Sequence, residues 1–175
     1  MDDELNKLGG DLSGKLGPTL VGFTVAHGEL TVEVARDRIC DVMKLLRDDP
    51  DYRFGSLIDV CGVDYPERDE RFDIVYHLLS PWKNLRMRVK VRTDAETPVS
   101  SIVGIFQAAN WFEREAFDLY GVVFEGHPDL RRILTDYGFE GHPLRKDFPL
   151  TGVVEPRYDD EQKRVVYEPV QLMQD

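Results

Sequence analysis

Two consecutive segments carry an apolar residue at every second position, and this alternation constrains the fold more than any other feature of the chain. A period of two residues is typical of a β-strand that buries one face. The apolar positions of residues 71–79 are Phe72, Ile74, Tyr76 and Leu78, and those of residues 85–93 are Leu85, Met87, Val89 and Val91. A turn of sequence PWKN at residues 81–84 joins the two segments. We therefore predict two strands whose apolar side chains face a core.

Further strands and a helix are predicted before these two segments. Residues 19–26 and 30–35 are rich in β-branched residues and flank a short connection at 27–29, which is typical of a hairpin. Residues 53–62 have the composition of a largely buried strand. Residues 36–49 carry Ile39, Val42, Met43 and Leu46 at helical spacing, and Pro50 follows their end.

Two more helix starts are predicted later in the chain. Thr97 followed by Pro98 is a favourable helix cap with proline at the first helical position. Asn110 and Glu113 resemble a capping box for a short helix that ends at Gly121. Together these elements predict an α+β fold with a mainly antiparallel or mixed sheet. The expected order is β-β-α-β-β-β-α, with the helices on one face of the sheet.

The composition and the apolar pattern of the sequence change after residue 140. Pro143, Pro149, Pro156 and Pro169 interrupt any long helix, and the apolar residues between them are scattered. Residues 152–155 and 164–168 are candidates for a pair of short strands. We therefore predict an α+β domain over residues 1–140 and an extended C-terminal arm over residues 141–175 that docks on partner subunits.

Charge and cysteine content exclude several classes of function. The net charge of -11 argues against nucleic-acid binding, which needs a basic surface. No apolar run approaches the roughly 20 residues that span a bilayer, and the acidic start, MDDE, resembles no export or transit signal. Cys40 and Cys61 are the only cysteines and form no Cys-x-x-Cys motif, so we expect neither a metal site nor an iron–sulfur cluster.

Residues 111–149 interleave charged, aromatic and turn-forming residues too densely for a free surface loop, and this pattern favours contact with a partner. Glu113 and Glu115 would lie about 200° apart on a helix, so they cannot converge on one substrate atom. Arg114 and Asp118 are four residues apart, which favours an ion pair. We interpret these four residues as docking or structural groups.

The two histidines of this segment permit more than one interpretation. His127 and His142 each lie between glycine and proline, where packing in a turn is favoured over metal binding or a role as a general base. Nearby basic and acidic residues favour an ion-pair network at a protein interface over a phosphate site, since no glycine-rich fingerprint precedes them. These residues are Arg131, Arg132, Arg145, Lys146, Asp129, Asp136 and Asp147. The basic row Arg86, Arg88, Lys90 and Arg92 is either a solvated sheet face or a surface that docks on an acidic neighbour.

The ordered motifs of residues 113–150 closely resemble those of the C subunit of proton-translocating NADH:quinone oxidoreductase, respiratory complex I (the 30 kDa subunit family). The matching motifs are ERE at 113–115, DLYG at 118–121, GHPDLRRIL at 126–134, TDYGF at 135–139 and GHPLRKDFPL at 141–150. A tail like RYD at 157–159 and YEP at 167–169 follows. Pro156 departs from the extended, hydrogen-bonded stretch that is usual in the family.

The resemblance implies a non-catalytic subunit of the peripheral arm that supports electron transfer from NADH to quinone. It implies no cofactor in this chain, with FMN and iron–sulfur clusters in partner subunits, and contacts with the D, B and I subunits of complex I in a hetero-oligomer. It places the chain peripherally, at the cytoplasmic face of a bacterial inner membrane. The expected partner interface consists of Glu113, Arg114, Glu115, Asp118, His127, Asp129, Arg131, Arg132, His142, Arg145, Lys146, Asp147, Phe148, Tyr158 and Tyr167.

Two alternatives remain open at this point. One is the equivalent subunit of a related membrane-bound hydrogenase or other ion-pumping dehydrogenase. The other is a free-standing enzyme that uses His127 or His142 as a base, which would turn over substrate in isolation.

We predict that the purified chain is colourless, binds no iron and oxidises no NADH. Two separated cysteines cannot supply the four thiolates of a cluster, and no nucleotide-binding fingerprint is present. Absorption spectroscopy, iron analysis and an NADH oxidation assay check this prediction. Stoichiometric iron or flavin on the pure chain would contradict it.

Overall fold

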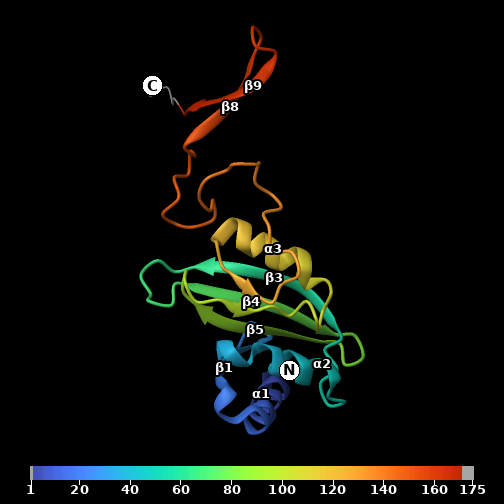
Figure 1. Cartoon of the computed structure of the whole chain (residues 1–175). Coiled ribbons are helices and arrows are strands. Elements are labelled where there is room, and N and C mark those ends of the chain that lie inside the picture. The colour runs from blue at the N-terminus through green and yellow to red at the C-terminus, as the bar shows by residue number, and fades with distance from the viewer. Residues whose placement is uncertain (1, 171–175) are drawn as a thin grey trace.

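A five-stranded mixed sheet forms the centre of the chain, with its strands in the order β1-β2-β5-β4-β3 (Figure 1). The computed structural model describes residues 2–170. The strands are β1 (Leu20–Ala26), β2 (Glu29–Val34), β3 (Ser56–Asp64), β4 (Phe72–Ser80) and β5 (Leu85–Thr93). Strands β2 and β5 run parallel, and all other neighbours in this sheet are antiparallel. The predicted α+β class and mixed sheet are confirmed.

The apolar face of this sheet is the one that the alternating pattern predicts. Its fully or almost fully buried side chains are Phe72, Ile74, Tyr76 and Leu78 of β4, Met87, Val89 and Val91 of β5, and Leu30, Val32 and Val34 of β2. Burying these side chains is favourable because it removes apolar surface from water. The sheet register is set by this requirement, since a shift of one residue would turn every apolar side chain to the opposite face.

Three helices pack on the apolar face: α1 (Asp2–Leu16), α2 (Ile39–Asp48) and α3 (Ala109–Tyr120). The predicted helix at 36–49 corresponds to α2, preceded by the 3₁₀ turn η2 (Arg36–Arg38). Helix α1 was not predicted from the sequence. It contains three glycines, which lower helix propensity, and packing of its buried Leu5 and Leu12 on the core compensates for that weakness.

The helix predicted at Thr97-Pro98 is wrong. The carboxylate of Asp94 accepts hydrogen bonds from the backbone N–H groups of Glu96 and Thr97 at 2.8 and 2.6 Å and from Thr97 Oγ1 at 2.8 Å. This arrangement closes a turn instead of starting a helix, as short polar side chains often do. The chain then enters β6 (Val99–Ser100), which pairs in parallel with β7 (Phe124–Glu125).

The C-terminal part contains the antiparallel pair β8 (Val154–Asp159) and β9 (Arg164–Pro169). A pair of short strands is confirmed, but the first strand begins two residues later than expected and continues to Asp159. This hairpin extends away from the five-stranded sheet (Figure 1), and Pro156 is accommodated opposite Tyr167 within it. The last five residues of the expected arm, 171–175, lie outside the described part of the chain. That residues 141–175 form a unit separate from residues 1–140 stays a prediction.

None of the helices within residues 2–170 combines the length and apolar character that crossing a bilayer requires.

Helix α3 approaches β3 closely at Gly62. A Cβ atom built at this buried position would lie 2.6 Å from Cδ2 of the Tyr120 ring. The ring of Tyr120 also packs edge-on against Phe72, with the two centroids 6.4 Å apart. Gly62 thus sets the distance between α3 and the sheet.

We predict that Gly62→Ala destabilises the chain by about 1–3 kcal/mol, because the added methyl group displaces Tyr120. Gly22→Ala is the matched control, since Gly22 also lies in a strand and its Cβ would meet no atom within 4 Å. Urea denaturation of both variants measures the free energy of unfolding. Equal stability of the two variants would contradict the prediction.

Candidate docking surface on α3 and the C-terminal segment

The C-terminal end of α3 is capped by residues that follow it in the sequence. A helix leaves its last four carbonyl groups without partners inside the helix. Here the carbonyl of Phe117 accepts from Gly121 N at 2.8 Å, and that of Leu119 accepts from Leu144 N at 3.1 Å. The carbonyls of Asp118 and Tyr120 accept from His142 Nδ1 at 2.8 Å and Arg145 Nε at 2.6 Å. The positive charge of Arg145 is also favourable at the negative end of the helix dipole.

Gly121 makes this capping arrangement possible. It has a φ of 76° in the left-handed region, which glycine adopts without steric cost. A Cβ atom at this position would lie 2.5 Å from Arg145 Nη2 and 2.6 Å from His142 Nε2. The predicted end of the helix at Gly121 is confirmed.

Asp118 holds the loop at residues 131–135 on α3. Its fully buried carboxylate accepts from the backbone N–H groups of Ile133, Leu134 and Thr135 at 3.0, 2.7 and 2.9 Å. It also accepts from Thr135 Oγ1 at 2.7 Å and from Arg132 Nη1 at 3.3 Å. Burial alone raises the pKa of this carboxyl, but the hydrogen bonds outweigh burial and lower the pKa to about 2.

The expected ion pair between Arg114 and Asp118 is wrong. Arg114 instead donates from Nε and Nη2 to the carbonyls of Arg131 and Arg132, at 3.1 and 3.3 Å. Asp118 forms its ion pair with Arg132. Both residues of the expected pair therefore hold the same loop, because the loop offers backbone donors and acceptors that the helix surface lacks.

Glu113 lies inside the chain and does not reach the surface that we predicted for it. The side chain is fully buried, and its carboxylate accepts from Ser101 Oγ at 2.6 Å and from Ile102 N at 2.8 Å. Burial raises the pKa of Glu113 from 4.5 to about 7, although these hydrogen bonds act in the opposite direction. The predicted capping box is wrong as well, because α3 begins at Ala109 and no side chain caps it. Glu115, by contrast, is exposed.

Both histidines of the segment make contacts that stabilise turns. His127 Nδ1 accepts from the backbone N–H of Asp129 at 3.0 Å, so its proton is on Nε2, which donates to the carbonyl of Asn110 at 3.1 Å. His142 caps α3, and burial lowers its pKa. Asp129 pairs with Arg131 at 2.9 Å. The geometry agrees with packing in a turn and leaves neither nitrogen of His127 free to act as a base.

An ion-pair network connects the end of β3 and the residue before β4 to the same segment. It includes Asp147, which we expected in a network at a protein interface, and Asp64 and Arg71, which the sequence did not indicate. Arg71 donates from Nε and Nη2 to the buried carboxylate of Asp64 at 2.6 and 2.7 Å, and from Nη1 to Asp147 at 2.9 Å. The backbone N–H of Lys146 also donates to Asp64, at 2.6 Å. Asp64 and Arg71 lie on opposite sides of a loop, so no local spacing in the sequence reveals the pair. Residues 142–147 are thus bonded to the α+β part of the chain.

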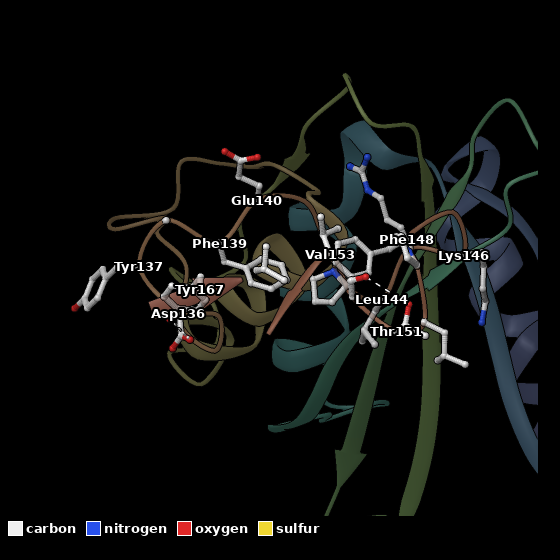
Figure 2. A pocket seen from close by; sticks show the side chains of 17 residues that line it. Asp136, Tyr137, Phe139, Glu140, Leu144, Lys146, Phe148, Thr151, Val153 and Tyr167 are labelled. Carbon is white, nitrogen blue, oxygen red and sulfur yellow. Dashed lines mark hydrogen bonds between the residues drawn. The ribbon is translucent and has the colours of Figure 1, made fainter. Parts of the chain in front are cut away.

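A cavity of about 1000 Å³ opens between residues 136–154 and Tyr167, as Figure 2 shows. Phe139 and Phe148 stack within its wall, with their centroids 5.9 Å apart. Tyr167 donates a hydrogen bond to Asp136 at 3.1 Å, which connects the hairpin to the rim. Large apolar side chains around the cavity remain exposed, namely Tyr137, Leu144, Leu150, Val153 and Val154.

The β8–β9 hairpin is amphipathic. The register pairs Val154 with Pro169, Pro156 with Tyr167 and Tyr158 with Val165, so these six apolar residues share one face. Tyr158, Val165 and Tyr167 are each more than half exposed, at 55%, 56% and 56%. A two-stranded hairpin is marginally stable without a covering layer, and a continuous exposed apolar face marks a site of interaction. We name this face, together with the exposed apolar rim of the cavity, the docking surface.

Three of the four residues of the basic row on β5 form ion pairs within the sheet. Arg88 pairs with Glu29 at 2.6 Å, Arg92 with Glu33 at 2.9 Å and Lys90 with Asp73 at 3.4 Å. Of the two interpretations given to this row, the structure favours a solvated sheet face.

Comparison with known proteins shows similarity along almost the whole chain. The family model described as "Respiratory-chain NADH dehydrogenase, 30 Kd subunit" matches residues 32–154. The C subunit of NADH-quinone oxidoreductase from Methylorubrum populi is 62% identical over 174 residues, covering 99% of this chain and 80% of that protein. The protein of the same name from Maricaulis maris is 60% identical over 175 residues, covering 100% of this chain and 88% of that protein.

A solved structure is also similar. It is described as the structure of the membrane-bound sulfane sulfur reductase, an archaeal respiratory membrane complex. The similar chain has a TM-score of 0.70 and 25% identity, and the match covers 84% of this chain and 86% of that one.

We predict that Glu113 makes the stability of the chain depend on pH. Between pH 4.5 and about 7, the folded state keeps the carboxyl protonated while the unfolded state has released the proton. The free energy of unfolding therefore falls as the pH rises through this window, by roughly 3 kcal/mol at most. Urea denaturation at several pH values should show this fall in the native chain, and Glu113→Gln should reduce it. The same pH dependence in both proteins would contradict the assignment.

Proposed function

The chain belongs to the family of the 30 kDa subunit of respiratory-chain NADH dehydrogenase, and we propose that it serves as the C subunit of a proton-translocating NADH:quinone oxidoreductase. In that complex it supports the transfer of electrons from NADH to quinone, ubiquinone being the expected acceptor. The observation that carries the proposal is the identity of about 60% to proteins of this name over essentially the full chain. Identity at this level along the whole length is far more specific than any single motif.

The proposed role is structural. The fully buried polar groups of α3, Glu113 and Asp118, make hydrogen bonds within the chain that stabilise its fold. The docking surface, in contrast, exposes apolar side chains that need a partner to cover them. A scaffold that arranges its neighbours fits this division better than a catalyst does.

The D subunit of the complex is the proposed partner of the docking surface, with the B and I subunits nearby, in a hetero-oligomer. FMN and the iron–sulfur clusters would be bound by partner subunits, since the two cysteines of this chain are too few to hold a four-thiolate cluster. The remaining exposed residues of the expected interface, among them Glu115, Lys146 and Asp147, lie on α3 and on the segment that leads to the hairpin. These positions are consistent with one continuous contact.

The proposed location is peripheral, at the cytoplasmic face of a bacterial inner membrane. Both relatives compared above are named as subunits of a quinone-reducing enzyme. The similar solved chain belongs to a structure described as a respiratory membrane complex. Attachment would then depend on partner subunits.

A second candidate is the equivalent subunit of another ion-pumping membrane complex, which the similarity to the sulfane sulfur reductase structure favours. The identity of 25% to that chain is much lower than the 62% identity to the Methylorubrum populi protein. The partners that copurify with a tagged chain distinguish these two candidates.

We predict that a tagged native chain copurifies with a complex that contains flavin and iron and that reduces quinone with NADH. A chain truncated after Gly152 should fold but lose this complex, because it keeps the residues that cap α3 and lacks the hairpin. A truncation after Glu140, the boundary expected from the sequence, is less informative because it also removes His142, Leu144 and Arg145 from the helix end.

A pair of single substitutions tests the docking surface without deleting it. Tyr158→Lys places a charge on the apolar face of the hairpin and should reduce the amount of assembled complex severalfold. Glu155→Lys changes the charge on the opposite face of the same strand and should have a much smaller effect. Normal assembly with Tyr158→Lys or with the truncated chain would exclude the hairpin as the contact.

A further inference from the structure

Three side chains with metal-binding groups meet on the face of the sheet opposite the helices. Asp59 and Cys61 lie two residues apart on β3, and His77 lies beside them on β4. One donor atom of each side chain lies within 4.8 Å of the donor atoms of the other two. His77 Nδ1 is 3.7 Å from Asp59 Oδ2. We name these residues the β3–β4 triad, and none of them belongs to the docking surface.

A β-bulge brings the triad together. The register pairs Leu57 with Leu78 and then Asp59 with His77, so β3 has one extra residue, Ile58, between the two pairs. Without the bulge, Ile58 would lie opposite His77. Bulges change the direction of side chains and are frequent next to functional sites. Asp59 and Cys61 are alternate residues of the strand and therefore share a face. The extra residue before them allows Leu57 to pair with Leu78 on the apolar face while Asp59 lies opposite His77 on the other face.

His77 has an unsatisfied polar atom within this group. Its Nδ1 is inaccessible to solvent and has no hydrogen-bond partner among the described residues. Buried polar atoms almost always have a partner, and a cation bound at this position would give Nδ1 one. The other ring nitrogen, Nε2, accepts a long hydrogen bond of 3.3 Å from Arg88 Nε.

The three groups form a typical ligand set for zinc. Zinc binds thiolate, imidazole and carboxylate ligands, and sites with three protein ligands keep a fourth position open. A recess of about 240 Å³, lined in part by Asp59 and His77, leaves space for that fourth ligand. Two negative ligands, the thiolate and the carboxylate, would balance the charge of a divalent cation.

We propose that Asp59, Cys61 and His77 bind a thiophilic divalent cation of the zinc type, with water at the fourth position. The cation bonds to Cys61 Sγ, His77 Nδ1 and an Oδ atom of Asp59. The thiol proton of Cys61 is released to solvent, and the ring proton that His77 carries on Nδ1 while Nε2 accepts from Arg88 moves to Nε2. Arg88 then gives up its bond to Nε2 but keeps Glu29 at 2.6 Å and Thr31 at 3.1 Å.

Linear spacing does not predict this site. The motif Asp-x-Cys on one strand and a histidine on the next matches no zinc pattern in the sequence, which is why we expected no metal site. The ligands meet only because of the hairpin pairing and the bulge. Neither observation depends on the proposed function of the chain.

Cobalt substitution tests the site in the purified full-length chain. Co²⁺ added to the metal-free protein should produce an absorption band of thiolate-to-cobalt charge transfer, and Zn²⁺ should abolish this band by competition. Cys61→Ser should remove the band, and Asp59→Asn and His77→Ala should each weaken cobalt binding by about tenfold or more. Cys40→Ser is the matched control, because it removes the other cysteine and should leave the band unchanged.

Absence of the band, persistence of the band in Cys61→Ser, or its loss in Cys40→Ser would each overturn the proposal. Circular dichroism and urea denaturation of every variant show whether the fold is retained. If Cys61→Ser fails to fold, isothermal titration of Zn²⁺ into His77→Ala and Asp59→Asn decides the question. Affinity equal to that of the native chain in both variants would overturn the proposal.

Discussion

The capped end of α3 determines where residues 131–145 lie. The last carbonyls of the helix accept hydrogen bonds from Gly121, His142, Leu144 and Arg145, and the carboxylate of Asp118 holds the loop at 131–135. The polar groups at the end of α3 thus find their hydrogen-bond partners in the residues that follow the helix. The hydrogen bonds of His142, Arg145 and the Asp118 carboxylate are at least partly buried, so leaving one of these groups without a partner would cost about 1–3 kcal/mol. Leu144 and Arg145 also line the cavity, so this part of its wall takes its position from the end of α3.

The sheet could be predicted from the sequence because a strand that buries one face has an apolar residue at every second position. Phe72, Ile74, Tyr76 and Leu78 stand at every second position, and a strand places all four on one face, where they are buried. Helix α1 shows no such pattern. Gly9, Gly10 and Gly14 lower its helix propensity, and packing on the core stabilises it. The helix expected at Thr97 failed for a related reason. The local signal was strong, but the carboxylate of Asp94 satisfied the same backbone groups in a turn.

The candidate site was predicted in outline and not in detail. The density of charged and aromatic residues after residue 110 predicted contact with a partner, which stays a prediction, and many of these residues make hydrogen bonds within the chain. Sequence spacing does not show whether a charged side chain points inwards or outwards, and Glu113, Asp118 and His142 all point into the chain. The partners of Asp118 come from residues 132–135, and those of Asp64 come from residues 71 and 146, so a search at helical spacing could not find them. The amphipathic hairpin became visible only when the register paired Tyr158 with Val165.

The β8–β9 hairpin also affects how much of this protein accumulates in the cell. Strands β8 and β9 form a two-stranded sheet, so each has an outer edge that pairs with no other strand among the described residues. Unpaired strand edges beside an apolar face promote association between copies of a chain, and they are recognised by chaperones and proteases. A copy without a partner thus exposes the strand edges and the apolar face that direct it to degradation. The amount of this protein would then follow the amount of its partner without any separate control of its synthesis.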